Sequence, residues 1–526
     1  MDYRLVFDIG SKVIKCAIAD ENHRIIHWEL IEPKVNITED GFGRSWDEKI
    51  YWNQILQVAA KTISLSNVDP QTIRYISACS IRPSCVFTDE KLDPLYIGAS
   101  FDIIGMDYGE EIEDKFQQEE GKSFYESSGN NPAFLMIPSR LAWIQDHRDL
   151  FHGTIPSSYL PLESWLLCKF GAEIHTNYSS AAESGFFDLN GRHYPDAWYS
   201  IFNLKPNFFP FPVKAGEVVG NISGNIQEKL NLHPDTELVA GLPDTQAALL
   251  GANCLTPQDI GAVIGSTTPV QAITRELILD KDERTWSSLF AVKHLPINYI
   301  LEANTGITGQ VITWGANLFA DNSNLPTHSF MENSNEKNKY EILGQKFAEF
   351  DQWEVNTPKD RLSDQMVIGN LGPTPLASSS SERAPGEFYF PSPGGVEKFQ
   401  IKQYQLVGAV YDNILFAVYR NIEYLHEIGN ITPKSVAILG GVAQNSTLVQ
   451  RFADLSKYTC HSSPSPESSL MGLLTLCDIA SGKLKSIEDL KRNAIENHHL
   501  QKFQPRQEMS EKLLEKYKKW LRITHN

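Results

Sequence analysis

The chain has 526 residues, 41% of them hydrophobic and 21% charged, a globular balance with enough length for two or more domains. Its formal net charge of -18 argues against a broad nucleic-acid-binding face, although backbone amides and one or two cations can still hold a nucleotide's phosphates. The apolar stretches are too short to span a bilayer and the seven cysteines include no CxxC pair, so we expect a cytoplasmic protein with reduced thiols and no membrane partner.

The chain opens with a pattern typical of a β-meander. Alternating apolar residues predict strands over 5–7, 13–19 and 24–30, with the polar turn Asp8-Ile9-Gly10-Ser11 at the first bend. The same patterns predict the elements that follow: helices over 51–64, 140–147 and 160–170, and a buried strand over 73–80. The first bend is therefore small, polar and glycine-containing.

A second organisational unit is expected to start near residue 253. A strand over 238–241 and a small-residue helix over 245–251 precede another strand, turn and strand, in which Gly265, Ser266 and Thr267 form the turn. The turns at 8–11 and 264–267 look like counterparts in two halves of the chain.

The later elements are predicted from composition and spacing. Residues 374–395 are rich in Ser, Pro and Gly and read as a long surface loop. A long helix over 406–425 is expected to end at Gly429, and a strand over 436–439 runs into Gly440-Gly441. The basic amphipathic helix over 509–521 is expected to pack on the body, with a membrane-surface role as the weaker alternative.

The first candidate phosphate site is the turn after the first strand. Gly10 allows close approach of the backbone to a phosphate, Ser11 offers a hydroxyl and an amide, and Lys15 supplies a positive charge. Asp8 is placed to hold Mg²⁺, because hard cations prefer oxygen ligands. Since Asp, Gly and Ser are also common in ordinary hairpin turns, this turn alone does not decide between the two interpretations.

Two further segments gain meaning from their order. Gly265, Ser266 and Thr267 are small residues in a tight bend that suits phosphate oxygens, although a plain turn has the same composition. Asp244 lies between a buried strand and a helix, where capping is the ordinary role. It precedes the second bend by about twenty residues, so it could instead accept the proton of an attacking hydroxyl.

The fourth segment is the Gly-Gly turn after the strand at 436–439. Close backbone approach at Gly441 suits a flat nucleoside, and Asn445 could donate a hydrogen bond to adenine. A single Gly-Gly pair is weak evidence, and its value lies in its place after the other three segments.

In this order the segments resemble the FGGY carbohydrate kinases of the actin, Hsp70 and sugar kinase superfamily. LVFDIGSKVIK is similar to their first phosphate motif, AGLPDTQAALLG to the catalytic-aspartate segment, IGSTT to the second phosphate motif, and ILGGVAQNSTLVQRFADL to the adenosine motif. The resemblance runs from residue 4 to about residue 480. It implies an α/β fold of two ribonuclease-H-like, actin-like ATPase domains with an active-site cleft between them. The domains expected are 1–252 (sugar side), 253–485 (nucleotide side) and a helical tail, 486–526.

The resemblance also implies residue roles. Asp244 would be the general base, and Asp8 and Asp244 would place Mg²⁺. The residues expected to bind ATP are Asp8, Gly10, Ser11, Lys15, Gly265, Ser266, Thr267, Gly309, Gly441 and Asn445. Those expected near the substrate are Arg82, Asp102, Asp244 and Gln246, where a surface ion pair for Arg82 and helix packing for Gln246 are the structural alternatives.

Several positions depart from the family pattern. Ser11 stands where threonine is usual, and Leu242-Pro243 replaces glycines before the catalytic aspartate. Asp102-Ile103-Ile104 loses a cation of the substrate segment, and Asp412-Asn413 replaces a Glu-Gly pair in the long helix. Among family branches, the autoinducer-2 kinases resemble this chain most, with xylulokinase-like and glycerol kinase-like enzymes also compatible.

The expected activity is ATP-dependent phosphorylation of a hydroxyl of a small sugar or polyol, with Mg²⁺. A family relative that binds sugar or nucleotide as a sensor or scaffold is the alternative, motivated by the changes near Asp102 and Asp412. A chaperone or actin-like filament protein explains the segment around Arg82 less well. Nucleic acid is not expected as a partner, and a homodimer is left open.

Overall fold

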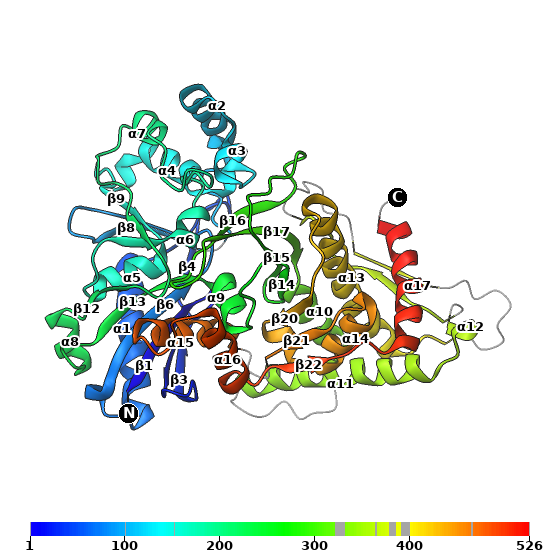
Figure 1. Ribbon diagram of the computed structural model, residues 1–526. Helices are drawn as coiled ribbons and strands as arrows, with labels where there is room; N and C mark the ends of the chain where they lie inside the picture. Colours follow the sequence, from blue (N-terminus) through cyan, green and yellow to red (C-terminus); the bar gives the residue numbers. More distant parts are fainter. Residues whose placement is uncertain are drawn as a thin grey trace. The chain divides into compact units, whose positions relative to one another are not determined.

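The computed structural model describes residues 2–99, 101–151, 153–320, 332–362, 365–377, 386–390, 400–463 and 467–524. Contacts divide the chain into two compact units whose segments alternate along the sequence (Figure 1). The first unit comprises Met1–Pro257, Ile273–Leu301 and Glu467–His499, and the second comprises Gln258–Ala272, Glu302–Pro466 and Leu500–Asn526. The domain boundaries expected after residues 252 and 485 stay a prediction.

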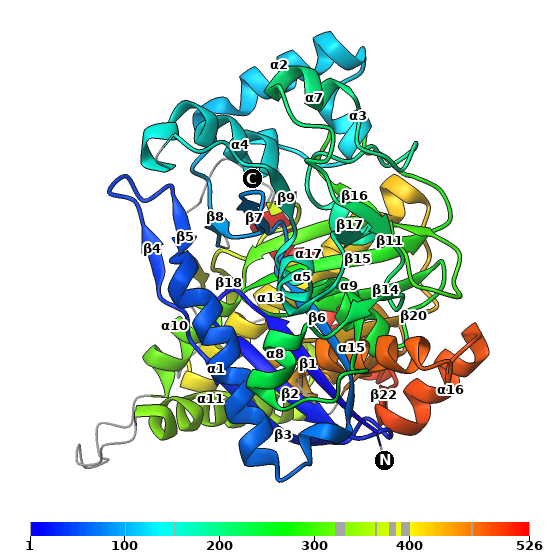
Figure 2. The ribbon, with the colours of Figure 1, turned by 90° about the vertical axis from the view of Figure 1, so that its left-hand side faces the viewer.

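The first unit is built on a six-stranded sheet in the order β12-β13-β6-β1-β2-β3, of which Figure 2 shows the strands β1, β2 and β3 in blue. The three central strands β13, β6 and β1 are parallel, and the remaining neighbours are antiparallel. The predicted β-meander is therefore confirmed as β1-β2-β3. The strands are β1 (Tyr3–Ile9), β2 (Ile14–Ala19), β3 (Ile25–Ile31), β6 (Ile73–Ser80), β12 (Val218–Asn221) and β13 (Glu237–Pro243).

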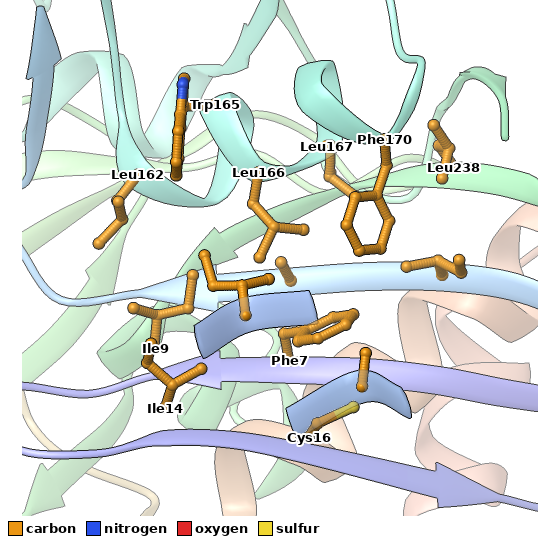
Figure 3. Packing of buried hydrophobic residues seen from close by; sticks show 14 of the residues in the cluster. Phe7, Ile9, Ile14, Cys16, Leu162, Trp165, Leu166, Leu167, Phe170 and Leu238 are labelled. Carbon is orange, nitrogen blue, oxygen red and sulfur yellow. The ribbon is translucent and has the colours of Figure 1, made fainter. Parts of the chain in front are cut away.

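The two faces of this sheet serve different purposes, because side chains alternate along each strand. On β1, Leu5, Phe7 and Ile9 lie in the core that helices α1 (Glu48–Ser66) and α5 (Leu162–Phe170) cover; Figure 3 shows Phe7 and Ile9 beneath the α5 side chains. Arg4 and Asp8 point to the other face, where they contact helix α15 (Ser468–Ala480). The alternation thus gives Asp8 a polar neighbourhood.

A second, five-stranded antiparallel sheet in the order β4-β5-β8-β7-β9 also belongs to the first unit. Its strands are β4 (Val35–Ile37), β5 (Arg44–Trp46), β7 (Cys85–Thr88), β8 (Pro94–Gly98) and β9 (Ser158–Leu160), and β10 (His175–Asn177) pairs separately with β11 (Phe211–Val213). The other elements of this unit are α2 (Gly109–Glu120), α3 (Phe124–Ser128), α4 (Ile137–Asp146), α6 (Tyr178–Ala182), α7 (Ala197–Phe202), α8 (Gly224–Leu230), α9 (Asp244–Gly251), β16 (Trp286–Phe290) and α16 (Ile487–Asn497).

The second unit has its own sheet, in which the strands follow the order β17-β15-β14-β20-β21-β22. Strands β14 and β20 are parallel, and β14 and β15 form an antiparallel hairpin. The strands are β14 (Asp259–Val263), β15 (Thr267–Thr274), β17 (Asn298–Ile307), β20 (Ser435–Leu439), β21 (Cys460–Ser462) and β22 (Gln501–Phe503). Both β15 and β17 continue along the chain into residues of the first unit.

The helices of the second unit include the two long ones predicted from the sequence. These helices are α10 (Gly309–Phe319), α11 (Glu332–Asn356), α12 (Lys359–Leu362), α13 (Gln403–Gly429), α14 (Ser446–Ser456) and α17 (Gln507–Thr524). Helix α13 ends at Gly429, as predicted. The residue with left-handed backbone that follows the helix is Asn430, with φ of 50°. The apolar side of α17 is buried at Leu513, Tyr517 and Trp520, so this basic helix packs on its own unit.

The predicted loop over 374–395 is only partly described, and one described part differs from the prediction. Strand β19 (Glu387–Tyr389) pairs antiparallel with β18 (Ile368–Asn370). The prediction rested on composition, which is insensitive to a three-residue strand whose partner lies in another segment. The remainder of this predicted loop, 378–385 and 391–395, lies outside the described residues.

Asp412 of α13, one of the positions that depart from the family pattern, is paired with two buried cations. Its buried carboxylate accepts hydrogen bonds from Arg451 Nη2 at 2.8 Å and from Lys516 Nζ at 2.6 Å, so α17 is tied to α13 by charge as well as by apolar packing. Although burial alone would raise it, the pKa of Asp412 is lowered by these two cations.

All seven cysteines are buried. Within the described ranges, no helix combines the length and the apolar character that crossing a membrane requires.

Candidate active site

The candidate catalytic residues meet at one edge of the first unit's sheet. Because β1, β6 and β13 are parallel neighbours, their carboxyl ends lie together, and Asp8, Cys79 and Leu242 occupy one row across the three strands. Asp244 follows β13 directly and opens α9. Parallel pairing therefore brings Asp8 and Asp244 to the same edge although 235 positions separate them.

Asp8 is half-buried, and both of its carboxylate oxygens accept hydrogen bonds. Cys79 Sγ donates to Oδ1 at 3.5 Å and Ser469 Oγ donates to Oδ2 at 2.7 Å. Burial raises the pKa of the Cys79 thiol, and the negative charges of Asp8 and Asp244 add to this rise. The thiol stays neutral beside the two carboxylates and donates its hydrogen bond to Asp8.

The residue Asp244 is partly exposed, but protein atoms surround its carboxyl group. Burial raises the pKa of this carboxyl to about 7, the charge of Asp8 adds to the rise, and Arg82 opposes it. Its Oδ1 accepts hydrogen bonds from the backbone N of Thr245 at 2.7 Å and from Thr245 Oγ1 at 3.1 Å. A carboxyl group with a pKa near 7 suits proton transfer at neutral pH.

Arg82 reaches Asp244 through Thr245 and is itself held by a glutamate. Its Nε donates to Thr245 Oγ1 at 3.1 Å, and its Nη1 donates to both carboxylate oxygens of Glu183 at 2.9 Å. The Arg82 side chain is 8% exposed and that of Glu183 is 3% exposed, so the pair is buried. The predicted alternative of a surface ion pair is therefore wrong, while a contact between Arg82 and substrate stays a prediction.

Gln246 belongs to the same cluster. It lies on α9, is fully buried, and donates from Nε2 to Glu183 Oε1 at 2.6 Å. Its Oε1 has no hydrogen-bond partner among the described residues. Arg82, Glu183 and Pro243 also line a small pocket of about 10 Å³, measured as room for the centre of a water molecule. This pocket has space for about one water molecule and not for a sugar.

Asp102 lies in a separate, fully buried polar group of the first unit. Tyr96 Oη donates to its Oδ2 at 2.6 Å, the backbone N of Arg44 donates to Oδ1 at 3.0 Å, and Arg140 Nε lies 3.6 Å from Oδ2. Helix α4 thus supplies, through Arg140, the cation that the local sequence pattern lacks. Contact between Asp102 and substrate remains a prediction.

The first candidate phosphate turn is a tight hairpin between β1 and β2. The backbone N of Gly10 donates to the carbonyl of Val13 at 2.9 Å, and a Cβ at Gly10 would lie 3.3 Å from that carbonyl oxygen. Lys15 is paired with Asp8 in the strand register and forms an ion pair with Glu467. The Lys15 ammonium also lies 5.5 Å from the centre of the Trp28 ring.

The second bend lies at the end of β14 in the other unit. The backbone N of Gly265 donates to the carbonyl of Thr267 at 3.0 Å, which closes the turn, and Ser266 at its tip is exposed. Gly309 begins α10 directly against this bend, because a Cβ there would lie 2.8 Å from the Gly265 carbonyl oxygen. Thr308 Oγ1 also donates to that oxygen, at 3.1 Å. Sequence position alone did not reveal that Gly309 shapes the bend.

The Gly-Gly turn follows β20 at the same sheet edge, since Val263 and Leu439 are register partners. Gly440 has φ of +90°, and a Cβ there would lie 2.4 Å from the Ile264 carbonyl oxygen, so only glycine fits. At Gly441, by contrast, no atom lies within 4 Å of the position that a Cβ would take. The Gly441 backbone therefore faces open space.

Asn445 caps helix α14. Its Oδ1 accepts hydrogen bonds from the backbone N of Thr447 at 3.1 Å and of Leu448 at 3.4 Å. This is the standard role of an asparagine before a helix. The cap occupies the side-chain oxygen, so any contact with a base would use the amide nitrogen.

The residues at these edges fit a nucleotide and a divalent cation. The open space beside Gly441 suits a nucleoside. The exposed Ser266 at the tip of the second bend suits phosphate oxygens. In the described ranges, no group of three or more His, Cys, Asp or Glu side chains could hold a metal ion. Mg²⁺ needs only one or two carboxylates when phosphates complete its ligands, and Asp8 and Asp244 offer two that repel each other.

Sequence reasoning missed three polar residues of this site. Glu183, Thr245 and Ser469 contact Arg82, Asp244 and Asp8 respectively. A signal was present for Glu183, because a charged residue within the run Ser-Ser-Ala-Ala-Glu-Ser-Gly-Phe-Phe requires a partner if that run is buried.

Comparison with known proteins agrees with this geometry. Residues 3–251 match the N-terminal domain of the FGGY family of carbohydrate kinases. The putative sugar kinase YoaC of Bacillus subtilis is 23% identical over 90% of this chain and 89% of its own length. Autoinducer-2 kinase of Escherichia coli K12 is 20% identical over 93% of this chain and 88% of its own.

Solved structures share the fold. Gluconate kinase from Lactobacillus acidophilus superposes with a TM-score of 0.79 at 15% identity, covering 100% of this chain and 98% of that one. Plasmodium falciparum glycerol kinase with ADP gives a TM-score of 0.77 at 15% identity, with the same coverage. The expected α/β fold, with two actin-like ATPase domains, is thereby confirmed. Residues 3–251 thus match the N-terminal domain of the FGGY family of carbohydrate kinases, and the chain as a whole is similar to sugar kinases in sequence and in fold.

Proposed function

We propose that this protein phosphorylates a hydroxyl group of a small sugar or polyol, with Asp244 as the general base and MgATP as the donor. The observation that carries this proposal is the Asp244 carboxyl, whose pKa is raised to about 7 by burial at the sheet edge that Asp8 shares. A group that titrates near neutral pH can take a proton from an attacking hydroxyl and release it afterwards.

The neighbours of Asp244 support this role. Thr245 donates twice to Oδ1, which fixes the carboxylate and leaves Oδ2 as the oxygen that can receive the proton. Asp8, held by Ser469, would bind the cation from the neighbouring strand. When bound, MgATP would supply the phosphoryl group, and its Mg²⁺ would offset the negative charge of the phosphate oxygens.

The glycine-shaped bends of the second unit support the same activity. Gly309 and Gly265 bring backbone close together at a tip with an exposed serine, as a phosphate-binding turn requires. Gly441 would then lie against the nucleoside. A substrate site between the two domains, a homodimer and a cytoplasmic location stay predictions.

The sensor or scaffold alternative loses its motivation. It rested on the altered residues near Asp102 and at Asp412, and both carboxylates have buried cationic partners, Arg140 and Arg451. Neither change removes a group from the Asp244 cluster.

A coupled assay of ADP release tests the proposal across ketoses, polyols, glycerol and the autoinducer-2 precursor, with wild type beside Asp244→Asn. We expect wild type to release ADP only with acceptors of this class, and the variant to be slower by roughly two to four orders of magnitude. ADP release that no acceptor stimulates, or near-normal turnover of the variant, would contradict the proposal.

A further inference from the structure

The FGGY fold alone does not decide whether the substrate is neutral or anionic, because the solved structures above include both a gluconate kinase and a glycerol kinase. The charge of the groups around Asp244 can decide this question. We propose that Glu183 is a specificity-determining residue: by neutralising Arg82, it makes the site accept uncharged polyhydroxy compounds and reject their carboxylate counterparts. This inference rests on the proposed function.

The first argument is the geometry of the ion pair. A buried arginine beside a substrate would normally attract a carboxylate, because the guanidinium group matches that shape. Here both carboxylate oxygens of Glu183 already lie 2.9 Å from Arg82 Nη1, while Nε is used by Thr245 at 3.1 Å. A substrate carboxylate would have to compete with a charged group that belongs to the protein and is already in place.

The second argument is the net charge of the site. Without nucleotide and divalent cation, the carboxylates of Asp8, Glu183 and Asp244 outnumber the single guanidinium of Arg82 in this cluster. Lys15, the register partner of Asp8 on β2, is paired with Glu467. An anionic substrate would therefore be repelled, and the repulsion is stronger in a partly dehydrated site than in water.

The third argument is independent of charge and concerns Gln246. Its Nε2 donates to Glu183 at 2.6 Å, which fixes the orientation of the amide, since a flipped amide would turn its oxygen toward a carboxylate. The fully buried Oε1 then lacks a donor among the described residues. A hydroxyl group placed there can donate a hydrogen bond to this acceptor, whereas a carboxylate group in the same position cannot.

The test compares neutral and acidic compounds of equal carbon number: sorbitol with gluconate, and xylitol with xylonate. Wild type should phosphorylate the neutral member of each pair with the higher kcat/KM. In Glu183→Gln, which keeps the shape and removes the charge, the ratio of kcat/KM for acid over neutral should rise at least about tenfold. Glu183→Asp, which keeps the charge, should retain the preference of wild type.

A matched control loses a buried carboxylate elsewhere in the same unit. Asp188→Asn removes the partner of Lys122, which has no link to Arg82, and should leave the acid-to-neutral ratio unchanged. Circular dichroism and the unfolding temperature show whether each variant is folded. An unchanged ratio in folded Glu183→Gln, or a wild type that prefers gluconate or xylonate, would overturn the inference.

A binding measurement separates this inference from the proposed function. The shift in unfolding temperature caused by sorbitol, xylitol, gluconate or xylonate is recorded without nucleotide. If wild type shows no kinase activity, the proposed function fails, yet larger shifts with the neutral compounds, reversed in Glu183→Gln, would still support the role of Glu183. Larger shifts with the acids, or no shift with any compound, would overturn it.

Discussion

At the sheet edge of the first unit, the candidate site consists of side chains that hydrogen-bond to one another. At the sheet edge of the second unit, it consists of backbone turns whose close contacts require glycine. Asp244, Thr245, Arg82 and Glu183 form a continuous chain of hydrogen bonds. In the second unit, by contrast, the contacts at the bend that Gly309 closes are mainly to backbone atoms.

This difference predicts how each edge responds to substitution. A polar network fails when one charge is removed, even if the shape is kept, because its members set one another's charge state and orientation. A glycine-shaped bend fails when a single methyl group is added, even if all charges are kept. The predictions below test this distinction, beginning with the largest effect.

The largest effect is expected for Asp244→Asn. This change keeps the volume and removes the base, so kcat should fall by roughly two to four orders of magnitude while KM for ATP changes little. Steady-state kinetics with the best acceptor measures both. A rise in KM for ATP as large as the fall in kcat would mean that Asp244 also binds ATP and that the two sheet edges do not have separate roles.

The second effect concerns the bend. In Gly309→Ala the new Cβ would lie 2.8 Å from the Gly265 carbonyl oxygen and 3.1 Å from Ser266 Cα. We expect a loss of about 1–3 kcal/mol in the free energy of unfolding and a rise in KM for ATP of about tenfold or more. Urea denaturation and ATP titration measure these quantities.

Gly224→Ala is the control, because Gly224 also begins a helix and no atom lies within 4 Å of its would-be Cβ. It should change the free energy of unfolding by less than about 0.5 kcal/mol. Equal effects of the two substitutions would show that the bend does not depend on close backbone approach.

The third prediction concerns the pH dependence of stability. Because the pKa of Asp244 is about 7 in the folded protein and near 4 in an unfolded chain, the folded state binds more protons between these values. The contribution of Asp244 to stability is therefore present at acidic pH and is lost as pH rises through about 7. The unfolding temperature of Asp244→Asn minus that of wild type should therefore be larger at pH 8 than at pH 5.

This comparison is made without nucleotide or divalent cation. Asp235→Asn, which removes a carboxylate whose side chain is 81% exposed, controls for the loss of one charge. A difference between Asp244→Asn and wild type that stays constant from pH 5 to pH 8 would contradict the raised pKa.

The smallest effect is expected at Asn445, where a cap and a nucleoside contact can be separated. Asn445→Asp keeps the acceptor that caps α14 and should leave stability unchanged, whereas Asn445→Ala should cost about 1 kcal/mol. If the amide nitrogen also contacts the base, Asn445→Asp should raise KM for ATP by up to about tenfold. Unchanged ATP kinetics in Asn445→Asp would show that this residue is a cap only.

Much of the fold could be read from the sequence, because the signals are local. The strand over 73–80 coincides with β6, and the helix over 406–425 lies within α13, since the apolar periods of 2 and 3.6 residues are properties of contiguous segments. The bends at Gly10 and Gly265 were predicted for the same reason: small polar residues between two apolar runs mark a turn. The order of these segments then indicated the family.

What only the tertiary structure decided is the set of partners. The sequence marks Asp8, Arg82, Asp244 and Gln246 as candidates, but parallel pairing of three distant strands brings Asp8 and Asp244 together, and only the folded chain places Glu183 on Arg82 and Arg140 beside Asp102. The physical reason is that the pKa and the charge of a buried group depend on neighbours close in space, and closeness in space is not encoded by closeness in sequence.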